Sequence, residues 1–301
     1  MIPKLIHQIW FQDNIDIILF SDDLDKNFKR IFSSKIPNIY KFNLIKLLLH
    51  NQDYSYCLWN EIKIYNFISI YYPKLLSFYT NLKYKIYKID FAKYIILYHY
   101  GGFYIDIDIE SFKSLNYIDK NDGLYFSKTA YLNNFENKLI KKFYDYQTNN
   151  YFINNGIMIA SAKHPFFLEI ISEAKKNIKN NKDYFYNSQV FNTLGPSLLT
   201  NSIIKYSNKY HDIHIIDNKY FEPCYGKDIT CKISKDTILM HQHKSVWIKN
   251  IETNNSFINF LFHKFFNLIF DSLTLYYFLY LRGYKLLYFV ILFIIYDYNK
   301  K

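Results

Sequence analysis

The chain has 301 residues, of which 50% are hydrophobic and 21% are charged, a balance that excludes an intrinsically disordered protein. Its formal net charge of +11 at pH 7 favours anionic partners such as nucleotides, nucleic acid or an anionic membrane surface. The basic residues are spread along the chain without a dense block, so nucleic acid is the least favoured of these. Cys224 and Cys231 could pair, but three cysteines without a disulfide framework or zinc spacing favour a reducing compartment.

Apolar runs and turn signals predict strands that alternate with helices. Pro73 interrupts one helical stretch, Gly101 and Gly102 end another, and Gly195-Pro196 lies within a third. The expected strands are 5–11, 54–59, 103–110, 151–160, 213–216 and 237–241, and the expected helices are 41–50, 60–80, 86–100, 166–178 and 188–206. This alternation predicts an α/β fold around a mostly parallel sheet.

Residues 103–110, FYIDIDIE, place two acids in an apolar stretch directly after the glycine pair. Successive side chains of a strand alternate between its faces, so Asp106 and Asp108 are expected to point the same way. Neighbouring carboxylates repel each other unless a positive charge lies between them, and a divalent cation with hard oxygen ligands meets that requirement. A solvent-facing strand with two exposed acids explains the same spacing equally well.

A pair of carboxylates also serves as acid and base in glycoside hydrolases. There the two groups flank the scissile bond at a separation of about 5–10 Å. Same-face neighbours on one strand lie near the lower end of that range and flank nothing, so hydrolysis is not favoured.

Asp90 and Lys93 lie one turn apart in the helix before the glycine pair and share a face. That face can reach the crevice at the carboxyl ends of the strands, where open α/β sheets bind ligands. The acid could then contact the hydroxyls or base of a nucleoside, and the lysine its phosphates. A surface ion pair is at least as common an explanation of this spacing.

Other polar and aromatic residues have two interpretations each. Trp10 follows the first expected strand and is either a core residue or a stacking platform. Asn154 and Asn155 interrupt an apolar strand, which indicates either a turn or, as we prefer, a contact to a bound ligand. His241 and His243 have the spacing of half a zinc site, without a matching half elsewhere in the sequence.

Four segments together resemble glycosyltransferase family 32, which includes outer-chain and inositol-phosphorylceramide mannosyltransferases. They are IPKLIHQIWF at 2–11, IDFAKYIILYHYGGFYIDIDIESFKSL at 89–115, NNGIMIASAKHPF at 154–166 and HQHKSVW at 241–247. The resemblance implies a GT-A-type, Rossmann-like catalytic domain over residues 1–250. It also implies a metal-dependent glycosyltransferase that moves a sugar from GDP-mannose or a UDP-sugar to a glycan or glycolipid acceptor, with retention of configuration.

The resemblance also implies roles for single residues. Asp108 would be the more direct ligand of Mn²⁺ (or Mg²⁺), and Asp106 would contact the donor ribose or sugar, partly through the metal. His241 matches the first histidine of the family's motif, and either it or Ser245 would be a third contact to the metal or diphosphate. The remaining expected donor-binding residues are Trp10, Asp90, Lys93 (usually Arg in the family), Gly102, Tyr104, Asn154, Asn155, Ser245 and Trp247.

Residues 251–301 form an aromatic-rich segment that is expected to be helical. A membrane span needs about 20 continuous apolar residues, whereas the longest clean run here is 286–296 and Arg282 and Lys285 interrupt the longer one. Basic residues among Tyr and Phe suit a membrane interface. We therefore expect a monotopic membrane anchor with the active site on the cytoplasmic side. Helices packed on the catalytic domain and a tilted span over 273–296 are the alternatives.

Two other functions compete with sugar transfer. The first is a catalytically silent family member that acts as a carbohydrate- or membrane-binding scaffold, and the replacement at Lys93 leaves room for it. The second is nucleic-acid binding, which lacks a recognisable reading motif. The intact acid pair favours the enzyme.

Overall fold

The computed structural model describes residues 1–11, 17–19, 24–118, 121–129, 152–180, 186–224 and 233–243. The chain divides into two compact units, Met1–His243 and Lys244–Lys301. The expected C-terminal helical segment, together with Ser245 and Trp247, lies outside the described residues. Among the described residues, no helix is both long enough and apolar enough to cross a membrane.

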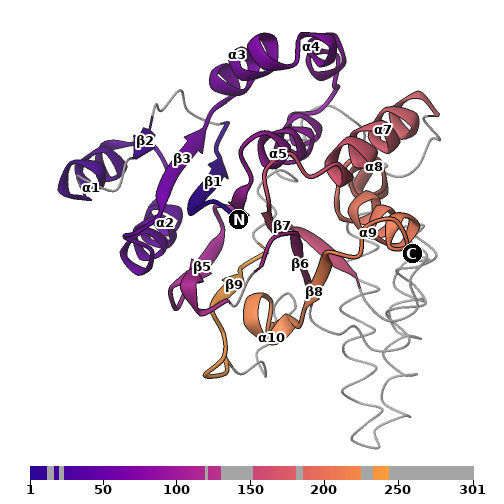
Figure 1. Ribbon diagram of the computed structural model, residues 1–301. Coiled ribbons are helices and arrows are strands. Elements are labelled where there is room, and N and C mark those ends of the chain that lie inside the picture. The colour runs from indigo at the N-terminus through magenta and orange to yellow at the C-terminus, as the bar shows by residue number, and fades with distance from the viewer. Residues whose placement is uncertain are drawn as a thin grey trace, which may run out of the picture. The chain divides into compact units, whose positions relative to one another are not determined.

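A seven-stranded sheet forms the centre of the first unit, with the strand order β2-β3-β1-β4-β7-β6-β8 (Figure 1). Its strands are β1 (Leu5–Ile9), β2 (Ile17–Leu19), β3 (Ser55–Trp59), β4 (Gly102–Ile105), β6 (Leu124–Lys128), β7 (Ile153–Ala160) and β8 (Ile213–Ile216). β2 and β7 run against the common direction of the other five strands. The expectation of an α/β fold around a mostly parallel sheet is therefore confirmed.

Helices pack around this sheet. They are α1 (Leu24–Ser33), α2 (Asn38–His50), α3 (Glu61–Tyr71), α4 (Pro73–Thr80), α5 (Lys85–Tyr100), α7 (Phe166–Lys179), α8 (Tyr186–Thr193), α9 (Pro196–Tyr206), α10 (Asn218–Phe221) and the 3-10 turn η1 (Leu115–Tyr117). All but α1, α10 and η1 lie close to where the sequence predicts them. The expected helix over 60–80 is two helices, and Pro73 is the first residue of α4. Proline lacks a backbone N–H, and the first residue of a helix has no hydrogen-bond partner for that group within the helix. Pro196 begins α9 in the same way.

The glycine pair between α5 and β4 turns the chain where side chains would collide. Gly101 and Gly102 have φ of +66° and +87°, a region that favours glycine. A Cβ on Gly101 would lie 2.5 Å from the backbone nitrogen of Ala162, and one on Gly102 would lie 2.3 Å from the carbonyl oxygen of Leu5. The buried His7 ring donates from Nε2 to the Gly101 carbonyl at 3.1 Å. These contacts fix where β4 begins, and therefore where it ends.

One sequence-based expectation about strands is wrong, and one alternative is excluded. β4 ends at Ile105, and the residues at 106–108 form a turn before β5 (Ile109–Ser111) instead of continuing the strand. β7 is continuous and buried at all eight positions, so Asn154-Asn155-Gly156 is not a turn between two short strands. The cause in both cases is tertiary, because β4 and β7 pair in the middle of the sheet.

A second, two-stranded sheet joins segments far apart in the sequence. β5 pairs antiparallel with β9 (Leu239–His241), and Ile109 lies opposite His241. The sequence predicts the apolar strand at 237–241 but not its partner. The pairing carries His241 to the turn that holds the two acids.

The thiols differ from the sequence-based expectation. Cys57 carries a reduced thiol, whereas Cys224 is disulfide-bonded. Structural disulfides persist mainly in oxidising compartments, so the expectation of reduced thiols is wrong for Cys224.

Candidate metal and donor site

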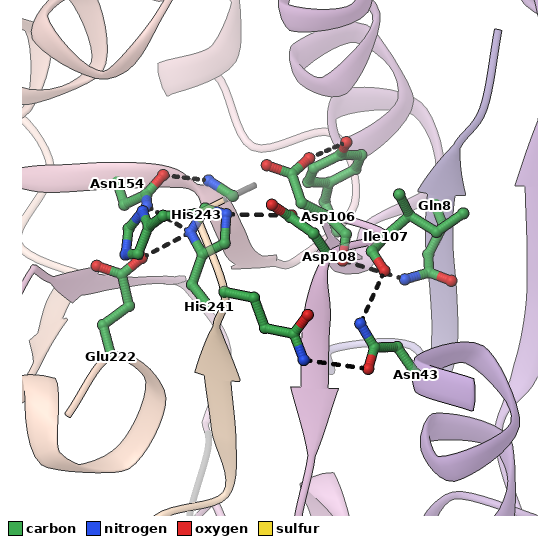
Figure 2. Close-up of polar contacts among 12 residues, drawn as sticks. Gln8, Asn43, Asp106, Ile107, Asp108, Asn154, Glu222, His241 and His243 are labelled. Atoms are coloured by element: carbon green, nitrogen blue, oxygen red, sulfur yellow. Dashed lines mark hydrogen bonds and ion pairs between the residues drawn. The ribbon is translucent and has the colours of Figure 1, made fainter. Parts of the chain in front are cut away.

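The turn at 106–108 is held by backbone and side-chain contacts from three directions (Figure 2). The Asp106 N–H donates to the Gly156 carbonyl of β7 at 2.8 Å. Gln8 of β1 donates from Nε2 to the Asp106 carbonyl at 3.3 Å, and Asn43 of α2 donates from Nδ2 to the Ile107 carbonyl at 3.4 Å. The two acids therefore project from a turn that neighbouring elements fix in place.

Asp106, Asp108 and His241 meet at this turn, as the sequence predicts. Each offers a ligand atom, and the three atoms lie within 4.8 Å of one another. His241 Nε2 is 3.1 Å from an oxygen of Asp108. Two hard carboxylates and one imidazole suit Mn²⁺ or Mg²⁺. These residues therefore fit the divalent metal that the resemblance implies.

Gly156 keeps the space beside these ligands open. A Cβ at this position would lie 2.8 Å from Oδ2 of Asp106 and 3.1 Å from Cε1 of His241. Any other residue would push one of the two side chains away. The glycine therefore belongs to the site although it offers no ligand atom.

Asp90 and Lys93 are buried, so the surface ion-pair interpretation is wrong. The Lys93 ammonium lies 3.1 Å from Asp90 and 3.2 Å from Asp106, and its side chain is 4% exposed. Tyr104 donates its hydroxyl to Asp106 at 2.6 Å, and its ring lies 4.9 Å from the ammonium. Asn155 donates from Nδ2 to Asp90 at 2.9 Å. Lys93 therefore bridges two carboxylates.

Burial and charge act against each other in this cluster. Burial raises the pKa of Asp90 to about 6, although the neighbouring ammonium opposes the rise. Burial by itself would lower the pKa of Lys93, but Asp106 and Asp90 outweigh it and raise the pKa. The ammonium therefore stays charged and serves as a fixed positive partner for the two acids.

Glu222 completes the other side of the site and was missed by the sequence analysis. It directly follows α10, is 1% exposed, and lies 3.0 Å through Oε1 from Nδ1 of His241. The Asn154 amide donates from Nδ2 to the same carboxylate and lies 2.8 Å from His241 Nδ1. The only sequence signal is an acid between Phe221 and Pro223, which is too common to indicate a site.

Two carboxylates control the protonation of His241. Burial lowers the pKa of this imidazole, but Asp108 and Glu222 outweigh burial and raise it to about 10. The ring of His243 stacks on that of His241, with centroids 4.1 Å apart and planes 26° apart. Burial and the His241 charge lower the pKa of His243. The two histidines therefore differ in charge although they touch.

Trp10 packs at the edge of the site, against α2. It is 6% exposed, and its ring centroid lies 5.7 Å from that of Tyr40 in α2. Burial and the nearby charge of Asp108 raise the pKa of Tyr40. The structure brings Asp90, Lys93, Tyr104, Asn154 and Asn155 together with the two acids and His241. Gly102 instead begins β4, at the opposite end of that strand from the turn.

A family model and a viral relative that match this chain are both described as glycosyltransferases. The family model described as "Glycosyltransferase sugar-binding region containing DXD motif" matches residues 37–124. The chain is 32% identical to the uncharacterized glycosyltransferase L373 of Acanthamoeba polyphaga mimivirus, over 84% of this chain and 86% of that protein.

Two yeast proteins are similar over shorter stretches. Mannosyl phosphorylinositol ceramide synthase SUR1 of Saccharomyces cerevisiae is 28% identical over 62% of this chain. Inositol phosphoceramide mannosyltransferase 2 of Schizosaccharomyces pombe is 26% identical over 60%. The matches span only 37% and 40% of those two proteins. A solved structure, the PaToxG glycosyltransferase, is 14% identical over 68% of both chains with a TM-score of 0.41, a likeness too remote to support an argument.

Proposed function

The chain belongs to the glycosyltransferases that share the DXD-containing sugar-binding region, and from this membership we propose that it transfers a hexose from a nucleotide-sugar donor to a glycan or glycolipid acceptor. The observation that carries the proposal is the meeting of Asp106, Asp108 and His241 within 4.8 Å. Such a set would hold Mn²⁺ or Mg²⁺ together with the donor diphosphate. When bound, the metal would neutralise the negative charge that develops on the departing nucleoside diphosphate.

The chain's own residues would fix the ligands of that metal. Glu222 accepts the Nδ1 proton of His241, and without metal the Nε2 proton points to Asp108. A bound cation would take the place of that Nε2 proton, while Glu222 would keep the ring oriented. Carboxylates often orient metal-binding histidines in this way. Asn154 holds Glu222 in turn, since its own oxygen accepts the Gly156 N–H at 2.8 Å and its Nδ2 must therefore point to the carboxylate. Glu222 is thus a positioning residue for His241.

Lys93 would act on the donor through Asp90 and Asp106. A direct phosphate contact would require its ammonium to leave one of the two carboxylates that it now bridges. We therefore propose that Lys93 holds Asp106 at the metal and Asp90 toward the donor sugar. Tyr104 and Asn155 would line the donor side of the same site through their contacts to Asp106 and Asp90. The donor roles expected for Trp10, Gly102, Ser245 and Trp247 stay predictions.

Donor identity and stereochemistry follow from the relatives only as proposals. The two yeast relatives are named for mannose transfer to inositol phosphoceramide. We propose GDP-mannose as the donor, a UDP-sugar as the alternative, and retention of configuration at the transferred sugar.

The test is a thermal-shift screen of the full chain with GDP- and UDP-sugars, each with and without Mn²⁺. A true donor should stabilise the folded protein by linkage, by about 2.7 kcal/mol at a hundredfold excess over Kd. We expect one donor to raise the Tm only when Mn²⁺ is present, and Asp108→Asn to lose the effect. Equal shifts with every nucleotide in EDTA would contradict a metal-dependent donor site.

We also propose that the protein is membrane-associated through residues 257–301. The disulfide of Cys224 supports an active site that faces an oxidising compartment instead of the expected cytoplasmic side. Deletion of residues 257–301 should release the protein from membranes while donor hydrolysis continues. Full-length protein that stays in solution without detergent would contradict the anchor, and a truncated chain that unfolds would support helices packed on the catalytic domain.

A further inference from the structure

α2 is apolar on two opposite faces, although only one of them is covered. Its inner face buries Leu44, Leu47 and Leu48. Its outer face exposes Ile39 by 44%, Phe42 by 61% and Leu49 by 46%. A helix that is apolar all round is normally buried all round. The outer face of α2 (Ile39, Phe42 and Leu49) therefore has the composition of a covered surface.

The charge around this face indicates what covers it. Residues 28–50 contain five basic residues and no acid. The basic residues are Lys29, Arg30, Lys35, Lys41 and Lys46. Phe32, at the end of α1, is 58% exposed, and its carbonyl accepts a hydrogen bond from Lys41 at 2.9 Å. Each basic residue near an anionic lipid surface contributes about 1 kcal/mol of attraction, and exposed Phe side chains can enter the interface.

A second exposed apolar face, on α3, lacks this charge. It carries Ile62, Tyr65, Ile70 and Tyr71, exposed by 52%, 45%, 69% and 54%. The charged residues of α3 are one acid, Glu61, and one base, Lys63. Apolar exposure by itself therefore does not distinguish the two helices, whereas charge does.

The inner side of α2 contacts the turn that holds the acid pair and the strand β5 that follows it. Asn43 donates to the Ile107 carbonyl and accepts from Gln242 at 3.4 Å. Lys46 pairs with Glu110 at 2.5 Å, and His50 contacts Ser111 at 2.9 Å. The outer face is thus separated from the site by about one helix diameter, 10–12 Å.

We propose that the outer face of α2, together with Phe32 and Lys35, docks on an anionic lipid bilayer and presents the acid-bearing turn to an acceptor hydroxyl carried by that membrane. The proposal rests on the proposed function and deepens it, because it makes the acceptor membrane-borne. It uses described residues only, and is separate from anchoring by residues 257–301.

The first test uses tryptophan quenching in the full chain. Phe42→Trp and its matched control Ile70→Trp are mixed with phosphatidylcholine vesicles, with and without phosphatidylserine, whose acyl chains are brominated. Bromine quenches only nearby rings, so the signal reports the substituted position even if another segment also binds lipid. We expect added quenching for Phe42→Trp with phosphatidylserine and none for Ile70→Trp.

Three results would overturn the proposal. Equal quenching of the two variants would mean that charge does not select this face. No quenching of Phe42→Trp by anionic vesicles would leave a protein partner as the occupant. A Phe42→Trp emission already shifted to the blue before lipid is added would mean that another part of this chain covers the face.

The second test separates docking from chemistry. Phe42→Ser with Leu49→Ser, and separately Lys35→Glu, should keep Mn²⁺-dependent donor hydrolysis in solution while transfer to a vesicle-borne acceptor falls. Lys35→Glu changes the charge at this face by two units and should weaken vesicle binding about thirtyfold. Ile62→Ser with Ile70→Ser is the matched control and should bind and transfer as the wild type does. Unchanged vesicle binding in the Phe42, Leu49 variant would overturn the docking face. A wild type without donor hydrolysis would instead refute the proposed function, and the quenching result would still decide the docking.

Discussion

The two flanks of the acid pair carry their positive charge in different ways. On one flank, Asp106 and Asp90 share the buried ammonium of Lys93, whose pKa is raised. On the other, Asp108 and Glu222 share the imidazole of His241, whose pKa is raised to about 10 by the two acids. An ammonium has no lone pair to offer while it stays charged, whereas an imidazole that gives up its proton becomes a metal ligand. A divalent cation can therefore replace the imidazole proton on the Asp108 side, which we call the exchangeable flank. The Lys93 side, where the ammonium keeps its charge, is the fixed flank.

The largest expected effect is on the exchangeable flank. Asp108→Asn should lower Mn²⁺-dependent transfer about a thousandfold, because a metal's charge stabilisation is worth several kcal/mol. The Tm in EDTA should stay equal or fall slightly, because Asp108 also pairs with the His241 imidazolium when no metal is bound. Donor turnover and thermal unfolding measure the two quantities.

Glu110→Gln is the matched control for Asp108→Asn. Glu110 is the next acid along the chain and pairs with Lys46 outside the cluster of metal-ligand candidates. It should keep turnover within about a factor of two, because exposed ion pairs contribute little. A comparable loss in both variants would contradict a specific role for Asp108.

On the fixed flank, the expected effect is on stability. Lys93→Met keeps the side-chain length but leaves the buried Asp90 and the partly buried Asp106 without their shared positive partner. Loss of such a partner typically costs about 3–5 kcal/mol. Urea unfolding above about pH 7, where both acids are ionised, measures the loss. Adding Asp90→Asn should restore part of it, and Lys93→Arg should retain the charge. A Lys93→Met protein as stable as the wild type would contradict the idea that the ammonium is a fixed support.

His7 shows what burial does to an imidazole that has no carboxylate beside it. Its Nδ1 accepts from Trp59 at 3.1 Å while Nε2 donates to Gly101, and burial lowers its pKa from 6.5 to about 4. Between pH 6.5 and about pH 4, the His7 ring is protonated in the unfolded chain but neutral in the folded chain. This contribution to stability is therefore complete above pH 6.5 and is lost as the pH falls toward 4.

The contribution of His7 can be measured by comparing denaturant unfolding at about pH 7 and about pH 5, where about 2 kcal/mol should be lost by linkage. His7→Gln has no titrating ring at this position and should lack that part of the loss. An identical pH dependence in the variant and the wild type would mean that His7 is protonated in the fold, like His241.

The smallest expected effect comes from Glu222, and it tests whether this residue orients His241 or binds the metal itself. Glu222→Gln should weaken Mn²⁺ binding about 10–100-fold, as is typical when the partner of a metal-binding histidine loses its charge. Titration of Mn²⁺ in the absence of donor measures it, and Glu222→Asp should recover part of the affinity. Glu169→Gln, a surface acid on α7, is the control. A loss as large as that of Asp108→Asn would make Glu222 a direct ligand instead.

The sequence by itself determined the features that local patterns encode. Alternating apolar runs predict β1, β3, β7 and β8, and the stop at Gly101 predicts the end of α5, because these signals act within a few residues of the chain. The long motif from Asp90 to Asp108 also indicates the acid pair and its helix partners before any fold is known.

The tertiary structure decided what depends on distant partners. Nothing local indicates that the acids lie in a turn, that Lys93 is buried, or that Asn154 continues a strand, because the pairing of β4 with β7 and the packing of α5 impose these states. Glu222 reaches His241 only because β9 pairs with β5. Side-chain burial and charge pairing are properties of the folded chain as a whole, so these contacts had no signature in the sequence around each residue.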